Sequence, residues 1–85
     1  MPEITFYSSQ NCSFCRAAEQ LLQRKGVTQL NKIRVDLDPQ QRVIMMERTQ
    51  QRTVPQIFIG DTYVGGYTEL AALERAGKLD ELLAK

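Results

Sequence analysis

The stretch SSQNCSFCRAAEQLL, residues 8–22, contains both cysteines of the chain, Cys12 and Cys15, separated by two residues. A close cysteine pair can be a disulfide staple, half of a metal site or a redox centre. The choice depends on the elements around the pair. Upstream, residues 3–8 are rich in β-forming side chains and predict a strand. Downstream, residues 12–26 predict a helix, so the pair lies on a strand-to-helix turn.

The order of predicted elements along the chain is β-α-β-α-β-β-α. The helix after the cysteines shows apolar residues at helical spacing and a glycine stop, namely Phe14, Ala17, Ala18, Leu21, Leu22 and Gly26. The later patterns predict a strand over 31–37, a helix over 38–50, strands over 55–60 and 62–66, a helix over 68–77 and a last short turn in 78–85. A β-α-β unit implies a parallel pair with a right-handed crossover, and the later strands imply a hairpin. One four-stranded mixed sheet with helices on both faces buries these elements most simply.

Local signals support the ends of these elements. Asp38 is a candidate N-cap, followed by Pro39 at the first helical position. Thr68 is the candidate N-cap of the last long helix, and Gly77 ends it. Alternating apolar residues mark the second strand: Ile33, Val35 and Leu37.

Length and composition are those of an ordinary small globular chain, expected to form one domain over residues 1–85. Apolar residues make up 42% and charged residues 25%, and the net charge of +1 includes no basic block, which argues against nucleic-acid binding. No apolar run approaches a membrane span, and no secretory leader is apparent. A cytoplasmic location is therefore expected, where a close cysteine pair favours catalysis or metal binding over a structural role.

The position of the pair favours redox chemistry. Cys12 falls where the strand ends and the helix begins, and the partial positive charge of a helix N-terminus stabilises a thiolate. The pKa of such a thiol is expected to lie below the usual value of about 8.5, with Arg16 adding favourable charge. Cys15, three residues further into the helix, is expected to be more buried and able to attack a mixed disulfide formed on Cys12. Cys12 is therefore the predicted nucleophile and Cys15 the resolving thiol.

The alternatives are weaker. A staple between residues so close in sequence closes a very small loop and stabilises little. A structural zinc site usually needs four ligands, and the chain offers one cysteine pair and no histidine. A metal site shared across a dimer, or completed by an external thiol, remains open.

The stretch RTVPQIFIG, residues 52–60, places Pro55 directly before a predicted strand. A proline is tolerated at a strand start, so the position has a plain structural interpretation. The functional hypothesis is a cis Val54–Pro55 bond facing the cysteines. The N–H and C=O of Val54 would then pair with an extended peptide as an added strand does.

The stretch VGGYTEL, residues 64–70, places Gly65 and Gly66 before a predicted helix. The pair is a plain turn, or else it permits close approach of a ligand. N–H groups at the start of that helix would bind a carboxylate, and the side chains of Thr68 and Glu69 would bind an amine. A peptide with both groups suits such a site.

Taken together, CSFC after a strand, TVPQIFI and GGYTEL at these spacings resemble the glutaredoxin family, and in particular its short bacterial dithiol members. The resemblance covers nearly the whole chain. It implies an α/β thioredoxin-like fold in which a four-stranded mixed sheet is flanked by three main helices. It also implies that the Cys12 thiolate reduces disulfide-containing and glutathionylated proteins, with glutathione as the electron donor.

The resemblance assigns residues to a glutathione site by position. Thr53, Val54 and Pro55 would line the site, with Val54 pairing with the cysteinyl backbone of glutathione. The γ-glutamyl end would be held by Gly66, Tyr67, Thr68 and Glu69. Phe14 stands where the family commonly has Tyr and would offer an apolar wall.

Two departures from the family pattern bear on function. Ser13 replaces the usual proline between the cysteines, which predicts an altered redox poise. Ser9 stands where many relatives carry a basic residue, so either Arg16, Gln51 or Arg52 substitutes for it or glutathione binds more weakly.

The loss of the proline also implies an alternative function. In the family it accompanies dimers that share a [2Fe–2S] cluster between two nucleophilic cysteines and two glutathiones. Cys12 would be the ligand, and a monomer is expected unless a cluster is bound. A third hypothesis is a thioredoxin-like protein reduced by a flavoprotein reductase.

Overall fold

The parallel strand pair expected from the first β-α-β unit is present, with one strand at the edge of the sheet and the other next to it. A computed structural model describes residues 1–85 and gives the strand order β2-β1-β3-β4. β1 pairs in parallel with β2 and antiparallel with β3, and β3 pairs antiparallel with β4. The strands are β1 (Ile4–Ser8), β2 (Asn31–Arg34), β3 (Gln56–Ile59) and β4 (Thr62–Gly65). The mixed sheet and its hairpin are confirmed.

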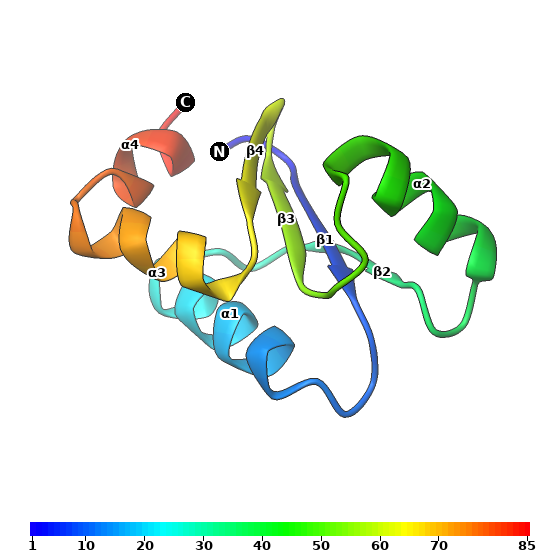
Figure 1. Cartoon of the computed structure of the whole chain (residues 1–85). Helices are drawn as coiled ribbons and strands as arrows, with labels where there is room; N and C mark the ends of the chain where they lie inside the picture. Colours follow the sequence, from blue (N-terminus) through cyan, green and yellow to red (C-terminus); the bar gives the residue numbers. More distant parts are fainter.

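Helices cover both faces of this sheet, as expected for the thioredoxin-like fold (Figure 1). The helices are α1 (Ser13–Arg24), α2 (Pro39–Thr49), α3 (Tyr67–Arg75) and the short α4 (Leu79–Leu83). Alternate strand residues point to opposite faces, so Ile4 and Phe6 join a core with α1, α3 and α4, while Tyr7 packs with Met45 of α2. Burying each such side chain stabilises the fold by about 1.5–3 kcal/mol.

Two local expectations, the end of the second strand and the N-cap of the last long helix, were wrong in detail. β2 ends at Arg34, and Leu37 is 73% exposed because the chain turns after the buried Val35, with the Leu37 N–H bonded to the Arg34 carbonyl. α3 begins at Tyr67 with Gly66 as its N-cap instead of Thr68.

Phe14 lies outside the core, unlike Ala18, Leu21 and Leu22 of the same helical apolar pattern. It is 61% exposed, because Cys15 takes the inward position in the first turn of α1 and is 3% exposed. The buried face of α1 continues from Cys15 through Ala18, Leu21 and Leu22. Phe14 is therefore free to form the wall of a surface site.

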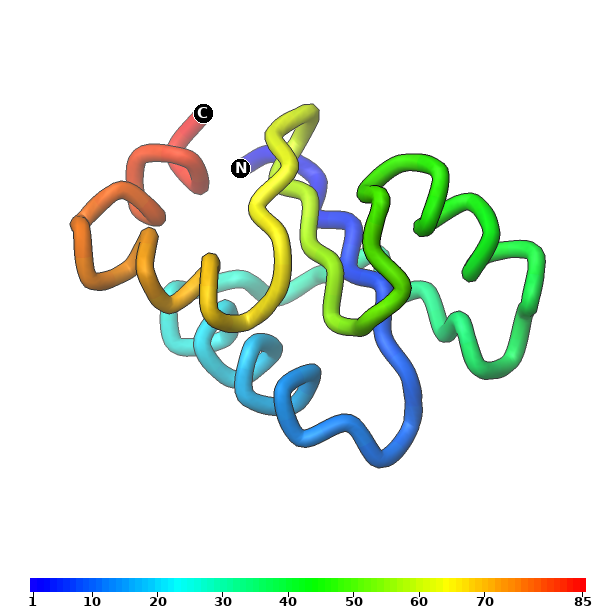
Figure 2. Tube along the Cα trace, in the orientation of Figure 1, coloured from blue at the N-terminus to red at the C-terminus, as the bar shows by residue number.

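The topology brings the predicted site segments to one end of the sheet. The carboxyl end of β1, the amino end of β3 and the carboxyl end of β4 meet there, because β1 and β4 both run antiparallel to β3. The β1–α1 loop, the segment before β3 and the turn into α3 consequently gather at this end (Figure 2). The longest helix has 12 residues, and none combines the length and apolar character needed to cross a membrane.

Candidate active site

The cysteine pair caps the N-terminus of α1. Cys12 is the N-cap residue, and its Sγ accepts a hydrogen bond from the main-chain N–H of Cys15 at 3.1 Å. The two sulfurs are joined in a disulfide, with the Cα atoms 5.2 Å apart. Cys12 is half-buried, whereas Cys15 is buried in the core, as the sequence predicted. The sulfur that a partner can reach is thus the one nearest the unpaired N–H groups of the helix.

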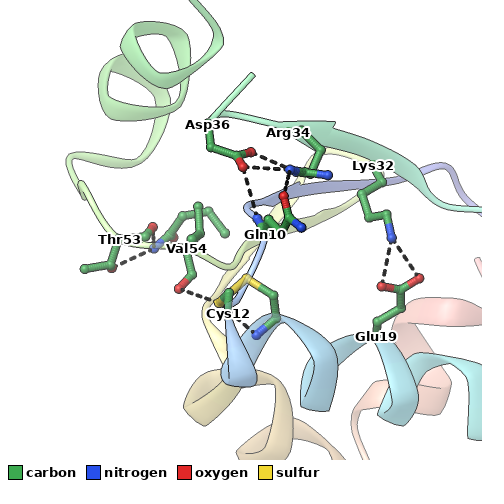
Figure 3. Close-up of a disulfide and its surroundings, with 10 residues drawn as sticks. Gln10, Cys12, Glu19, Lys32, Arg34, Asp36, Thr53 and Val54 are labelled. Atoms are coloured by element: carbon green, nitrogen blue, oxygen red, sulfur yellow. Dashed lines mark hydrogen bonds and ion pairs between the residues drawn. A yellow bond between two sulfur atoms is a disulfide. The ribbon is translucent and has the colours of Figure 1, made fainter. Parts of the chain in front are cut away.

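The loop before β3 faces this sulfur from across the site. The carbonyl oxygen of Val54 lies 3.7 Å from Cys12 Sγ, although the two residues are 42 positions apart in the chain (Figure 3). The Val54–Pro55 peptide bond is cis, which confirms the hypothesis made from the sequence. Val54 is half-buried and Pro55 is buried.

A surface hollow of about 470 Å³ adjoins the cysteines. Its wall includes every residue that the resemblance assigns to glutathione: Phe14, Thr53, Val54, Pro55, Gly66, Tyr67, Thr68 and Glu69. Neither cysteine lines the hollow itself, but Phe14 lies between them in sequence and Val54 contacts Cys12. Residues from separate segments of the chain therefore form one continuous site.

Two aromatic rings form one side of the hollow. Phe14 of α1 and Tyr67 of α3 stack with their centroids 6.0 Å apart and an angle of 30° between the ring planes. Such a pair contributes about 0.5–1.5 kcal/mol beyond its buried area. The stack joins the cysteine helix to the start of α3 and gives the hollow an apolar wall.

The turn into α3 brings main-chain groups to the hollow. The Gly66 N–H donates to Oε1 of Glu69 at 2.7 Å, so the Glu69 carboxylate reaches back over the first turn and makes Gly66 the N-cap. A Cβ on Gly65 would lie 2.9 Å from Glu69 Oε1, and one on Gly66 would lie 3.3 Å from the Pro55 carbonyl oxygen. A side chain at Gly65 would also strain the backbone, because the φ of Gly65 is 113°, whereas Gly66 is packed tightly against Pro55.

Sequence reasoning missed Gln56 and Tyr63, which also line the hollow. The buried Gln56 side chain donates from Nε2 to the Thr53 carbonyl at 3.0 Å, and its Oε1 accepts from the Tyr63 hydroxyl. The sequence did contain a signal for these two residues, namely the hairpin predicted over residues 55–60 and 62–66. Its pairing places Tyr63 opposite Phe58 and within hydrogen-bond reach of Gln56. Burial and the nearby charge of Glu69 raise the pKa of Tyr63 above its usual value, so its hydroxyl remains a donor at neutral pH.

The loop before Cys12 carries a second polar cluster. Gln10 contacts Arg34 and Asp36 at the end of β2 (Figure 3). Hydrogen bonds from the Arg34 guanidinium, helped by the Gln10 N–H, hold the pKa of the Asp36 carboxyl well below its usual range. Asp36 is therefore ionised throughout the neutral range.

The structure combines a thioredoxin-like sheet with a cysteine pair at a helix N-terminus, opposite the loop that carries Val54. This combination defines a class of thiol–disulfide oxidoreductases. The family model named Glutaredoxin matches residues 4–64. The chain is 49% identical over 84 residues to a glutaredoxin of Pseudomonas aeruginosa, covering 99% of each chain. It is 45% identical over 83 residues to a glutaredoxin of Neisseria meningitidis, covering 98% of each. The chain belongs to the glutaredoxin family.

Solved structures agree with this assignment. The solution structure of a glutaredoxin from Brucella melitensis superposes with a TM-score of 0.85 at 44% identity, covering 98% of this chain and 89% of that one. A buckwheat glutaredoxin, solved in complex with glutathione, superposes with a TM-score of 0.87 at 27% identity, covering 95% of this chain and 76% of that one. The fold and the dithiol pair make this protein a thiol–disulfide oxidoreductase.

Proposed function

We propose that this chain, folded as one glutaredoxin domain, is a glutathione-dependent oxidoreductase that reduces protein disulfides and glutathione mixed disulfides. The observation that carries the proposal is the position of Cys12 Sγ. It lies 3.1 Å from the Cys15 N–H at the start of α1 and 3.7 Å from the Val54 carbonyl oxygen, beside a hollow that contains all the positions assigned to glutathione.

In the reduced protein, Cys12 is the nucleophile. Its thiolate is stabilised by the Cys15 N–H and by the positive end of α1, a setting that lowers the pKa of cysteines. The thiolate attacks one sulfur of a protein disulfide, forms a mixed disulfide with it and releases the other sulfur as a thiolate, which takes a proton from water. The half-buried sulfur of Cys12 is the one that a large substrate reaches.

Cys15 is the resolving thiol for protein disulfides. Its thiolate attacks Cys12 Sγ, the bond to the substrate breaks, and the Cys12–Cys15 disulfide forms as the second substrate thiol leaves. The buried Cys15 cannot meet a large substrate directly, but it lies within disulfide reach of Cys12.

Two glutathione molecules restore the dithiol. The first glutathione thiolate attacks Cys12 Sγ, which releases Cys15 and leaves glutathione on Cys12. The second attacks the glutathione sulfur, releasing glutathione disulfide and the Cys12 thiolate. In sum, one protein disulfide and two glutathiones yield two protein thiols and one glutathione disulfide. A glutathione mixed disulfide needs only Cys12, which attacks the glutathione sulfur and releases the protein thiol.

The hollow suits the glutathione attached to Cys12 in this scheme. Val54 presents main-chain groups next to the sulfur and pairs with the cysteinyl backbone of glutathione as an added strand does. The Phe14–Tyr67 stack packs against the tripeptide. N–H groups in the first turn of α3 bind its γ-glutamyl carboxylate, and the side chains of Thr68 and Glu69 bind its amine. Thr53, Pro55 and Gly66 complete the site. We place the reaction in the cytoplasm, with a monomer as the active form.

The test is the reduction of a small glutathione mixed disulfide, with glutathione as the sole electron source. Turnover is expected in the wild type and in Cys15→Ser and is expected to be lost in Cys12→Ser. Reduction of a protein disulfide is expected to need both cysteines. An active Cys12→Ser variant would show that Cys12 is not the nucleophile. An inactive wild type would show that the protein does not catalyse glutathione-dependent reduction.

The second candidate is a [2Fe–2S] cluster shared by two chains, favoured by Ser13 at the first position of α1. The donor set fits this only across a dimer, since one chain offers a single accessible cysteine sulfur, that of Cys12, and two small thiols must supply the remaining ligands. The proposed reductase cycle uses no such group. Anaerobic reconstitution with iron, sulfide and glutathione tests it: visible absorbance with a dimeric mass supports the cluster, and a colourless monomer excludes it.

A further inference from the structure

Arg34, the last residue of β2, and Asp36, two residues beyond it, hold the loop that leads into Cys12. The Asp36 carboxylate accepts a hydrogen bond from the main-chain N–H of Gln10 at 3.2 Å. It also accepts two from the Arg34 guanidinium, at 2.8 and 2.7 Å, in a bidentate pair. Arg34 in turn reaches the side-chain oxygen of Gln10 at 3.5 Å. Figure 3 shows Gln10 held through both its main chain and its side chain by this pair, here called the loop clamp.

The clamp extends the strand pairing beyond the end of the sheet. Ser8 and Arg34 are partners in the parallel ladder, and the Val35 N–H donates to the Ser8 carbonyl at 2.9 Å. Regular pairing stops there. The Asp36 side chain then supplies the acceptor for the Gln10 N–H. The loop is therefore fixed to the sheet up to two residues before the active cysteine.

The residue between the clamp and Cys12 needs such support. Asn11 has a φ of 59°, in the left-handed region, where a residue with a side chain is about 1–2 kcal/mol less stable than in the right-handed region. Such conformations persist where the surrounding structure holds them. Downstream, the Cys12 carbonyl accepts the Arg16 N–H at 3.1 Å. Asn11 is thus held between the clamp and the first turn of α1.

The residue after Cys12 adds no comparable restraint. Ser13 occupies the first helical position, where a proline would fix the backbone φ next to the sulfur. The conformation of Cys12 therefore depends more heavily on the loop upstream. If that loop moves, Sγ leaves the position in which it accepts the Cys15 N–H and faces the helix N-terminus.

We propose that Arg34 and Asp36 are positioning residues for Cys12, and that the loop clamp sets the reactivity of its thiol by holding Sγ against the first turn of α1. The inference rests on the proposed function in taking Cys12 as the nucleophile. The test measures the reactivity of the Cys12 thiol and needs no glutathione. The inference can therefore fail or succeed independently of the reductase activity.

The experiment compares two charge-neutral double variants in a Cys15→Ser background, where only Cys12 can react. Arg34→Ala with Asp36→Ala removes the clamp. Glu19→Ala with Lys32→Ala is the matched control. That pair lies 3.1 Å apart and joins the same strand to α1 without touching the loop (Figure 3). Each double variant removes one positive and one negative charge.

The readout is the rate of alkylation of Cys12 by iodoacetamide across pH, which reports the thiolate fraction. Losing the clamp is expected to move the midpoint of the profile upward and to lower the rate on its acidic side about threefold, because the helix N-terminus stabilises the displaced thiolate less. The control is expected to match the parent. Equal profiles for the clamp variant and the control would overturn the proposal.

A measurement on the parent chain keeps the proposal falsifiable if the clamp variant fails to fold. Hydrogen exchange of the Gln10 amide is expected to be slowed relative to an unstructured peptide, because its N–H is bonded to Asp36. Exchange at the unstructured rate would mean that the clamp does not hold the loop in solution, and the inference would be wrong.

Discussion

The side-chain amide of Gln56 donates to the main-chain carbonyl of Thr53 at 3.0 Å, and so ties a buried residue of β3 to the loop that faces Cys12. The opposite side of the same amide accepts the Tyr63 hydroxyl from β4. Gln56 is 4% exposed, so this amide has few other partners available. It links the hairpin to the wall of the candidate glutathione site.

Replacing Gln56 with leucine should therefore affect both stability and binding. The change removes the hydrogen bonds that Gln56 makes with the Thr53 carbonyl and the Tyr63 hydroxyl, and at about 1 kcal/mol for each bond we expect the free energy of unfolding to fall by about 2 kcal/mol. We also expect a higher KM for a glutathione mixed disulfide, because the Val54 loop is less well held. Urea unfolding and steady-state kinetics measure the two effects.

Tyr63→Phe is the matched variant for this network, since it removes one hydroxyl and keeps the ring, whose centroid lies 5.1 Å from that of Phe58. We expect a smaller loss of stability, about 1 kcal/mol, because one hydrogen bond is removed and the amide keeps Thr53. If Tyr63→Phe were as damaging as Gln56→Leu, the tie to Thr53 would not be the important contact.

Phe14→Ala is expected to weaken glutathione binding without unfolding the protein. The Phe14 ring is 61% exposed and stacks on Tyr67 beside the hollow, so little core packing is lost. Removing an aromatic contact of this kind should raise KM about fivefold with kcat nearly constant. Leu37→Ala is the control, because Leu37 is also exposed, at 73%, but does not line the hollow. A similar change in both variants would argue against a specific role for Phe14.

The residues around the hollow show what sequence reasoning can reach in this fold. The order of the elements, the place of the cysteine pair and the residues of the three motifs around the hollow could be predicted, because glycines, prolines and short apolar patterns act locally, whereas Gln56 and Tyr63 were missed. Strand directions then bring the β1–α1 loop, the Val54 loop and the α3 turn to the same end of the sheet. The site follows from that topology together with the motifs.

The contacts that hold the site in place could not be predicted in the same way. Gln10 and Asp36 are 26 positions apart, and their hydrogen bond depends on the point at which β2 stops and the chain turns. The N-cap of α3 was misplaced at Thr68 because the capping group is the Glu69 carboxylate, which bonds the Gly66 N–H from inside the helix. Such contacts depend on side-chain conformation as much as on residue type.

Gly65→Ala is expected to be strongly destabilising. Gly65 has a φ of 113°, and an added Cβ would lie 2.9 Å from Glu69 Oε1, so the change strains the backbone and disturbs the cap of α3. Gly77→Ala separates the two effects, because Gly77 has a φ of 73° but open space around it. We expect a loss of about 1 kcal/mol for Gly77→Ala from the backbone alone, and a clearly larger one for Gly65→Ala. Equal losses would mean that Glu69 moves aside freely.

Lys25 provides a prediction about alkaline pH. Its Nζ lies 2.8 Å from Asp80 and 3.0 Å from Glu74, joining the end of α1 to α3 and to the start of α4. Hydrogen bonds that Lys25 donates to Asp80 first, and then to Glu74, raise the pKa of Lys25 above its usual value of 10.5. Because the pKa of Lys25 is higher in the folded state than in the unfolded state, the stabilising contribution is fully present below the unfolded pKa and disappears as pH rises through the folded pKa.

The difference in unfolding free energy between the wild type and Lys25→Gln should therefore be constant from pH 7 to about 10 and vanish above it. It should also shrink with added salt, since the ion pairs lie at the surface. A difference that persists at high pH would mean that the aliphatic stem of Lys25, and not its charge, joins the helices.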